Sequence, residues 1–316
     1  MGRKSNESTI HGVLLLDKPF GLSSNAAVQW VRRLFARTKG GHVGTLDPQA
    51  TGLLPVCLGE ATKFSAGMFG ADKTYEADVL LGVTTTTGDA EGQVTARSAV
   101  NVAHEDLVRV LPRFVGNVQQ TPPIYSALKK NGRPLYEYAR AGVHVDIVPR
   151  QVIVYAIDAI DRQRDRLRLR VRCGTGTYIR VLAEDIGREL GCGASLCGLR
   201  RTAVGPFAVS DAMSFDYLES VTEGARIARL LPVDSLVAGL PAHRLDETMT
   251  RRVLQGQACQ LPYAGECGPV RLYGPDNRFL GLGDMSAEGA LVARRLISTA
   301  PPPMTPADVP SCNLKA

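Results

Sequence analysis

One aspartate, Asp47, stands in a segment with a tightly constrained backbone, "GGHVGTLDPQATGLLPVCLGEATK", residues 40–63. The glycines, Gly44 among them, permit positive φ angles, and Pro48 biases Asp47 toward an extended backbone. A carboxylate on such a stiff loop is suited to act on one atom of a bound substrate. The local sequence alone favours a simpler interpretation, in which Asp47 is the first residue of an Asp-Pro turn.

Several other chemistries lack the residues that they need. No G-K-[ST] follows the glycines, so the segment is not a Walker loop, and "CGTGTYIR", residues 173–180, lacks the third glycine of a dinucleotide fingerprint. Ordinary glycoside hydrolysis would need a second acid, and Asp89 and Asp185 are candidates only by elimination. The seven cysteines form no C-x-x-C pair and no Cys/His array, so we expect no metal site and no disulfide framework.

The elements around Asp47 follow from hydrophobic spacing. Residues 12–17 indicate a buried strand, and residues 73–82 a half-buried strand with Tyr75 on its apolar side. Residues 40–63 are expected to form a glycine-rich loop. Between 12–17 and this loop, a Ser23/Ser24 cap precedes apolar residues at helical spacing: Ala27, Trp30, Val31, Leu34 and Phe35.

The second half of the chain shows two further patterns. Residues 162–173 alternate with period 2, arginines on one side and apolar residues on the other, which predicts a strand with one solvated face. Residues 178–191 have apolar residues at helical spacing and end at Gly191, a typical C-cap. Beyond about residue 240, short apolar runs between turn signals indicate a small all-β unit, with a boundary between roughly 230 and 245.

Residues 121–150 interrupt this order with a polar and aromatic stretch. Cations interleaved with tyrosines can hold phosphates while stacking on bases, so we expect RNA contact there. The cations include Lys129, Lys130, Arg133, Arg140 and Arg150, and the tyrosines are Tyr125, Tyr136 and Tyr138.

Composition limits the class of protein. The chain has 316 residues, 44% of them apolar, and a formal charge of +6, which is compatible with a polyanionic partner. No run of about 18 apolar residues occurs, and the N-terminus is unlike a signal peptide, so we expect a cytoplasmic protein without a membrane span. Residues 1–10 and 299–316 are polar or proline-rich, and disorder is expected at both ends.

Six separated blocks, taken together, carry a more specific signal. The chain resembles the bacterial tRNA pseudouridine synthases of the TruB type from about residue 11 to 298. The blocks are "DKPFGLSS" (17–24), residues 40–63, "KTYEADVLLGVTTTTGDAEG" (73–92), "QTPPIYSALKKNGRPLYEYAR" (120–140), "GTYIRVLAEDIG" (176–187) and "GLRRTAVGPF" (198–207).

The resemblance implies an α+β pseudouridine synthase fold: a mixed, largely antiparallel sheet flanked by helices and loops. It implies a catalytic domain at 11–235, with an RNA-binding thumb at about 121–150, and a small PUA-like domain at 240–298. The implied reaction isomerises uridine 55 in the T-loop of tRNA. This isomerisation breaks the bond from C1′ to N1 and joins C1′ to C5 without redox change, so no cofactor is expected. The implied partner is the tRNA T-arm, and a monomer is the default.

The resemblance also assigns roles to single residues. Asp47 corresponds to the catalytic aspartate and Arg180 to the arginine that pairs with it, while Tyr75 corresponds to the tyrosine that stacks on the flipped uracil. His42 corresponds to the residue that helps displace and hold the T-loop bases. Tyr178 and Leu199 correspond to pocket-lining positions, and Lys18 and Lys63 to basic positions near the pocket.

Physical chemistry accounts for part of this set. Burial beside a base would raise the pKa of an aspartate, whereas an arginine within about 4–6 Å lowers it by about 1–3 units. Extraction of a base from a folded loop costs a few kcal/mol, and stacking on an aromatic ring returns about 1–3 kcal/mol. The sequence leaves open whether Asp47 attacks a carbon or removes a sugar proton.

Three positions depart from the family pattern: Val43 stands in place of threonine, Thr84 in place of a frequent basic residue, and Thr175 in place of a lysine. They put peripheral RNA contacts in doubt. Two other functions stay open on sequence: an RNA-binding or tRNA-folding protein, and a synthase for a uridine in another RNA.

Overall fold

The computed structural model describes residues 10–126, 128–143, 145–261 and 267–298, so the ends expected to be disordered lie almost wholly outside the described residues. The chain divides into two compact units. The first contains residues 10–59 and 65–231, and the second contains residues 60–64 and 232–298. The short segment 60–64 thus joins the second unit, although the sequence pattern did not separate it from its neighbours.

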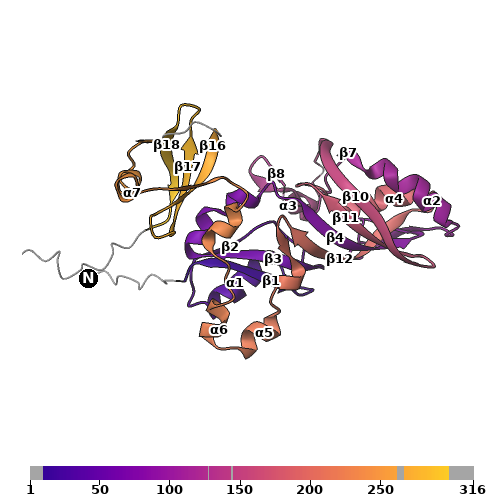
Figure 1. Ribbon diagram of the computed structural model, residues 1–316. Helices are drawn as coiled ribbons and strands as arrows, with labels where there is room; N and C mark the ends of the chain where they lie inside the picture. The colour runs from indigo at the N-terminus through magenta and orange to yellow at the C-terminus, as the bar shows by residue number, and fades with distance from the viewer. Residues whose placement is uncertain (1–9, 127, 144, 262–266, 299–316) are drawn as a thin grey trace, which may run out of the picture. The chain divides into compact units, whose positions relative to one another are not determined.

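A mixed sheet forms the frame of the first unit (Figure 1). Its pairings are antiparallel except that β12 runs parallel to β3, in line with the expected fold class. The strand order is β1 (Gly12–Lys18), β3 (Ala50–Leu58), β12 (Ala194–Val204), β4 (Lys73–Leu81), β11 (Arg166–Cys173), β10 (Arg150–Gln163) and β7 (Gly116–Gln120). β2 (Gly40–His42) pairs with β3, and β13 (Phe207–Ala208) with β12.

Two helices close the two main cores of this unit. α1 (Ser24–Leu34) begins where the Ser23 side chain accepts a hydrogen bond from the Ala26 N–H, and its apolar face packs on β1 and β3. α4 (Ile179–Glu189) packs on β4 and β11. The remaining elements are η2 (Ser65–Met68), β5 (Val83–Thr85), β6 (Val94–Arg97), α2 (His104–Val110), η3 (Leu111–Phe114), η4 (Val209–Asp211), α5 (Phe215–Ser220) and α6 (Glu223–Ile227).

The expectation that residues 40–63 form one loop is wrong. β2, β3 and the 3₁₀ turn η1 (Gly59–Lys63) occupy most of the segment, and the connection between β2 and β3 spans only residues 43–49. The run "ATGLLPVCL" is a strand buried on both faces, which periodicity alone does not distinguish from other structures. Gly52 permits its packing, because a Cβ there would lie 2.3 Å from the Arg201 carbonyl oxygen.

The expected arginine strand at 162–173 is also corrected in part. Arg162 lies near the end of β10, and a turn at Arg164, with φ of 53°, separates it from β11. The solvated face holds ion pairs with acidic residues on and beside β4, at N–O distances of 3.2–3.6 Å. These pairs are Arg168–Asp78, Arg170–Glu76 and Arg172–Asp72.

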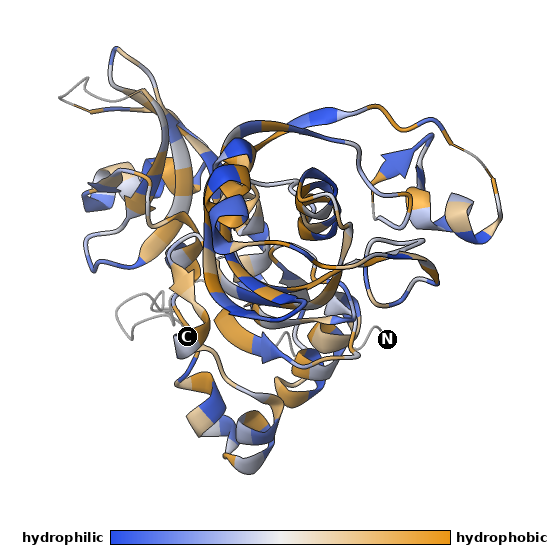
Figure 2. Ribbon diagram, turned by 90° about the vertical axis from the view of Figure 1, so that its right-hand side faces the viewer, coloured by the Kyte–Doolittle hydropathy of each residue, from blue (hydrophilic) through white to orange (hydrophobic). Residues whose placement is uncertain are grey.

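The insertion at 121–150 contains short elements. They are β8 (Lys129–Lys130), β9 (Arg133–Pro134) and α3 (Leu135–Arg140). Figure 2 colours the ribbon by hydropathy, and blue and orange alternate along the strands and helices, as expected for elements with one buried face.

The second unit is a five-stranded sheet with one α-helix, α7 (Glu247–Leu254), that the sequence pattern did not predict. The strand order is β14 (Ala242–Arg244), β16 (Gly268–Tyr273), β17 (Phe279–Met285), β18 (Ala290–Leu296) and β15 (Cys259–Gln260). The unit also contains η5 (Val233–Val237) and residues 60–63 of the 3₁₀ turn η1. None of the helices in the described ranges is long and apolar enough to cross a membrane.

Candidate active site

A cavity of about 1110 Å³ in the first unit brings most of the expected site residues together. It is lined by residues from the 43–49 loop, from β4 and β12, and from the start of α4. The expected residues in its wall are His42, Asp47, Tyr75, Tyr178, Arg180 and Leu199.

The loop that carries Asp47 is fixed on both sides of this residue. Leu46 is buried in the core beside α1, and both its N–H and its carbonyl bond the Ser24 hydroxyl at 2.8 Å. The Ala50 N–H donates to the Asp47 carbonyl at 3.0 Å and closes a turn with Pro48 as its second residue. The Asp-Pro turn is therefore present, and it leaves the Asp47 side chain half exposed in the cavity.

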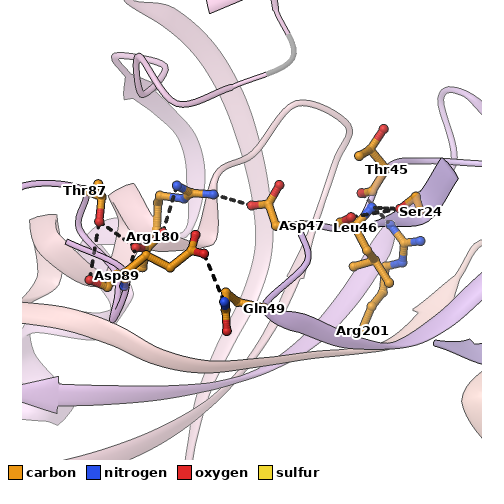
Figure 3. A network of polar contacts seen from close by, with 10 residues as sticks. Ser24, Thr45, Leu46, Asp47, Gln49, Thr87, Asp89, Arg180 and Arg201 are labelled. Carbon is orange, nitrogen blue, oxygen red and sulfur yellow. Dashed lines mark hydrogen bonds and ion pairs between the residues drawn. The ribbon is translucent and has the colours of Figure 1, made fainter. Parts of the chain in front are cut away.

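Arg180 donates to Asp47 with one terminal nitrogen and pairs with Asp89 through the other, at 2.8 Å (Figure 3). Its side chain is only 9% exposed. A cation in the first turn of a helix is disfavoured by the helix dipole, and the two carboxylates offset that cost. Arg180 is thereby held with one face toward the cavity and Asp47.

Asp89 is a site residue that sequence reasoning left among candidates by elimination. Its carboxylate is 14% exposed and accepts hydrogen bonds from the Thr87 hydroxyl at 2.6 Å and the Glu91 N–H at 3.1 Å. These bonds fix Asp89 on the side of Arg180 away from Asp47, as Figure 3 shows. The pairing joins residues far apart in the chain, so local spacing gave no signal for it.

Arg201 is a second site residue that the sequence did not indicate, and it binds the backbone of the loop that carries Asp47. Its guanidinium is buried and donates to three backbone carbonyls: Leu53 at 2.8 Å, Gly44 at 2.9 Å and Thr45 at 3.3 Å. In the sheet, Arg201 of β12 is also the register partner of Tyr75 in β4. Arg201 therefore links the Asp47 loop to the tyrosine in the same cavity.

Tyr75 lies on β4, between Val171 of β11 and Arg201 of β12. Burial raises the pKa of its phenol, so the hydroxyl is protonated at neutral pH. Leu199, on β12, is half buried and packs against the same two cores as Tyr75. An aromatic ring and an aliphatic side chain thus form the apolar part of the wall.

Tyr178 is the N-cap residue of α4 and is anchored by its backbone. The buried Gln120 side chain accepts from the Tyr178 N–H at 3.0 Å and donates to its carbonyl at 3.3 Å. The Arg150 guanidinium lies 5.3 Å from the ring centre of Tyr178. The ring is therefore oriented before any ligand binds.

His42 ends β2 at the edge of the cavity. Burial lowers its pKa, and the positive charge of Arg201 lowers it further, so the imidazole is neutral at pH 7. Its Nδ1 atom is buried and has no hydrogen-bond partner among the described residues. A neutral ring with an unmatched polar atom is suited to contact a base rather than a phosphate.

Lys18 is placed differently from the expected basic contact near the pocket. It is completely buried, and its ammonium donates to the carbonyls of Leu22 at 2.7 Å, Pro19 at 2.9 Å and Pro48 at 3.4 Å. Burial lowers its pKa to about 8, although the negative charge of Asp47 raises it. Lys18 fastens the Asp47 loop to the turn after β1 and is not exposed to a ligand.

Lys63 belongs to the segment that joins the second unit. Its ammonium pairs with Glu60 at 2.7 Å and donates to the Ser298 hydroxyl at 3.0 Å and the Leu296 carbonyl at 3.2 Å. A role for Lys63 in RNA contact stays a prediction.

Four cations of the insertion are exposed, and two of these four lie over tyrosine rings of the insertion; the four are Lys129, Lys130, Arg133 and Arg140. Arg133 lies 5.0 Å from the ring centre of Tyr138, and Arg140 lies 5.5 Å from that of Tyr136. Lys130 donates to the Asp146 carbonyl, and Lys129 precedes it in the same short strand. Cations and aromatic rings therefore share one exposed segment, as the sequence suggested.

The three residues that depart from the family pattern, Val43, Thr84 and Thr175, have different surroundings. Val43 is 1% exposed and faces the core, so it is not a peripheral RNA contact. The Thr84 hydroxyl shares a hydrogen bond with that of Thr95, and Thr175 is exposed at the cavity. Within the described ranges, no group of His, Cys, Asp and Glu side chains is arranged to hold a metal ion.

Three family models match consecutive parts of the chain. Residues 32–179 match the TruB family pseudouridylate synthase N-terminal domain, and residues 180–238 match the tRNA pseudouridylate synthase B C-terminal domain. Residues 241–297 match the C-terminal model of pseudouridine synthase II TruB. Together they span both compact units.

Relatives and a solved structure agree with these models. The tRNA pseudouridine synthase B of Dechloromonas aromatica is 53% identical over 92% of this chain and 97% of its own length. That of Aromatoleum aromaticum is 50% identical over 92% and 94%. An H/ACA ribonucleoprotein structure, bound to a substrate RNA containing 2′-deoxyuridine, matches with a TM-score of 0.69 and 25% identity, covering 92% of this chain and 85% of that one.

Proposed function

Because this chain belongs to the TruB family of pseudouridylate synthases, we propose that it isomerises uridine 55 in the T-loop of tRNA to pseudouridine. The observation that carries the proposal is the arrangement in the cavity, where Arg180 holds the half-exposed Asp47 beside Tyr75. No change of oxidation state is required, since the substrate and product are isomers.

The reaction needs one group that breaks the bond from C1′ to N1. Asp47 acts as an anion, either by attacking a carbon or by removing a sugar proton to release the base. The uracil then rotates, C1′ joins C5, the proton on C5 leaves to solvent and N1 takes up a proton. Arg180 gives the Asp47 carboxylate a charged hydrogen-bond partner that stays in place when the entering nucleoside displaces water from the cavity.

The other side chains hold the extracted base. Tyr75 provides an aromatic face, and stacking offsets about 1–3 kcal/mol of the extraction cost. Leu199 and Tyr178 complete the wall, and the His42 ring at the edge of the cavity contacts a neighbouring base of the loop. These roles rest on the positions of the residues in the cavity and on their match to the family motif.

Recognition of the T-arm is assigned to the insertion at 121–150. Its cations contact phosphates, and its tyrosines stack on bases or orient the cations. We expect the second unit to be a PUA-like domain that also contacts RNA, and the protein to act as a cytoplasmic monomer.

Tritium release tests the proposed function. Unmodified tRNA carrying tritium at uracil C5 is incubated with the protein, without an added cofactor. We expect release equal to one tritium per target uridine, because only the formation of the bond from C1′ to C5 frees this label. Folded protein that releases no tritium from T-loop substrate would overturn the proposed activity.

Two controls identify the site and the RNA. Asp47→Asn should still bind tRNA and release no tritium, whereas retained turnover would remove Asp47 from its role. A tRNA with cytidine at position 55 should release no label from uridines elsewhere. Release from that tRNA, or from another RNA at an equal rate, would identify a synthase with a different target.

A further inference from the structure

Two phenylalanine rings are exposed in the wall of the cavity that contains Asp47. Phe20 is 65% exposed and Phe69 is 59% exposed. Of the exposed large apolar side chains in the described ranges, these two are the ones that line this cavity. A phenylalanine ring has no polar atom that water could satisfy, so this exposure leaves apolar surface available to a ligand.

The backbone that presents Phe20 is tied to the loop of Asp47. Gly21, with φ of 81°, donates its N–H to the Pro48 carbonyl at 2.8 Å. The buried Lys18 ammonium binds the carbonyls on either side of Phe20, those of Pro19 and Leu22. These hydrogen bonds hold the backbone of Phe20 in place next to Pro48, the residue that follows Asp47.

Phe69 lies in the short connection between η2 and β4. It follows η2, where its N–H donates to the Ala66 carbonyl at 3.2 Å, and its own carbonyl accepts from Lys73 at 3.4 Å. Lys73 is 8% exposed and also lines the cavity. No ring pair formed by the described aromatic residues includes Phe20 or Phe69.

We propose that Phe20 and Phe69 are stacking platforms for the T-loop bases that adjoin the extracted uridine. The inference rests on the proposed function and extends its binding site. Removal of one nucleotide from a stacked loop exposes the faces of its neighbours, which enter the mouth of the same cavity. A neutral apolar ring matches a base face and offers nothing to a phosphate.

Binding and fluorescence test this proposal in the full-length Asp47→Asn protein. The probe is a T-arm stem–loop RNA in which 2-aminopurine replaces one loop base beside the target uridine at a time. We expect fluorescence to fall on binding for at least one position, and Phe20→Ala or Phe69→Ala to reverse that fall. Each alanine variant should bind about 5- to 150-fold more weakly, the range for loss of one stacked base.

Salt dependence and matched variants separate stacking from other losses. Because a neutral ring displaces no counterions, the slope of log Kd against log salt should not change in either variant. Phe20→Trp should retain the fluorescence loss, whereas Phe20→Leu, which is apolar but not aromatic, should not. Tyr155→Ala removes an exposed aromatic ring that does not line the cavity, and it should bind like the reference protein.

Different results overturn different statements. If Phe20→Ala and Phe69→Ala leave affinity and the fall in fluorescence unchanged, while the protein with Asp47 intact releases tritium normally, the stacking inference alone is overturned. A change in the salt slope equal to that of a lost cation would also overturn it. Failure of the parent to bind the stem–loop would overturn this inference and the proposed function together.

Discussion

The carboxylate of Asp89 lies 2.8 Å from the guanidinium of Arg180, on the side away from Asp47 (Figure 3). Asp89 is itself fixed by Thr87 and by the Glu91 N–H. Because Asp89 holds one terminal nitrogen of Arg180, the other terminal nitrogen is directed at Asp47. Asp89 is thus a positioning residue for Asp47, acting through Arg180.

Asp89→Asn should lower kcat more than it raises KM. The amide keeps the shape of the side chain but not its charge, so Arg180 loses its anchor while Asp47 remains. A shift of about 1 Å in a reacting group can cost about 100-fold, which sets the upper range of the loss. Steady-state tritium release measures both constants.

Asp185→Asn is the matched control for this variant, because Asp185 lies in α4 and pairs with Arg188 rather than with Arg180. It should leave kcat within about threefold. Equal losses in the two variants would show that Asp89 acts on the fold of the region and not on the direction of Arg180.

Arg201→Met should raise the pKa of His42. Burial is the larger cause of the low pKa of this imidazole, and the charge of Arg201 is the second, so removal of the charge raises the pKa without restoring its ordinary value. Proton NMR titration of His42 measures the change. Arg201→Lys keeps the positive charge and should leave the pKa nearly unchanged.

The same two variants should separate charge from hydrogen bonding. Methionine leaves the carbonyls of Gly44, Thr45 and Leu53 without their donor, at about 1–3 kcal/mol for each buried group. Lysine offers fewer and less directed bonds than the guanidinium, so kcat should fall in both variants. Normal kcat in Arg201→Met would contradict a role in holding the loop.

Lys18 should make stability depend on alkaline pH. Its pKa is about 8 in the folded chain and 10.5 when unperturbed, so between these values the unfolded state binds more protons. Stability from this group therefore rises as pH increases from about 8 to 10.5, by about 3 kcal/mol in total. Urea unfolding at several pH values measures it against Lys18→Met, which should lack this rise; parallel pH curves for the two proteins would contradict it.

Much of the frame could be predicted from the sequence, because its signals are local. The helix at α1 has a serine cap and an apolar face, and Tyr75 lies on the apolar side of its strand, as alternation indicates. In the segment around Asp47, the sequence predicted the Asp-Pro turn but not the strands β2 and β3. Gly52 serves the close approach of β3 to β12, which is a tertiary contact that spacing does not show.

The residues of the site also fall into two groups: those that the sequence motifs indicate and those that only tertiary contacts reveal. Motif resemblance gave Asp47, Arg180 and Tyr75, and they line one cavity. Asp89 and Arg201 act through contacts between residues that are distant in the chain, so no pattern pointed to either. Lys18 was expected to face a ligand, because a sequence does not show whether a lysine is buried.

The lysines of the insertion should contribute to RNA binding through charge. Lys129 and Lys130 are exposed at neighbouring positions in β8, where each can neutralise one phosphate. Replacement of both by alanine should reduce the slope of log Kd against log salt by about 2 and weaken binding most at low salt. Filter binding of tRNA from about 50 to 200 mM salt, with Asp47→Asn as the parent, measures the slope.

Arg109→Ala is the control for this experiment. Arg109 is also exposed, but it is paired with Asp106 in α2, outside the insertion. The salt slope of the Arg109→Ala variant should therefore equal that of the parent. A double lysine variant with the parental slope would place the phosphate contacts elsewhere on the chain.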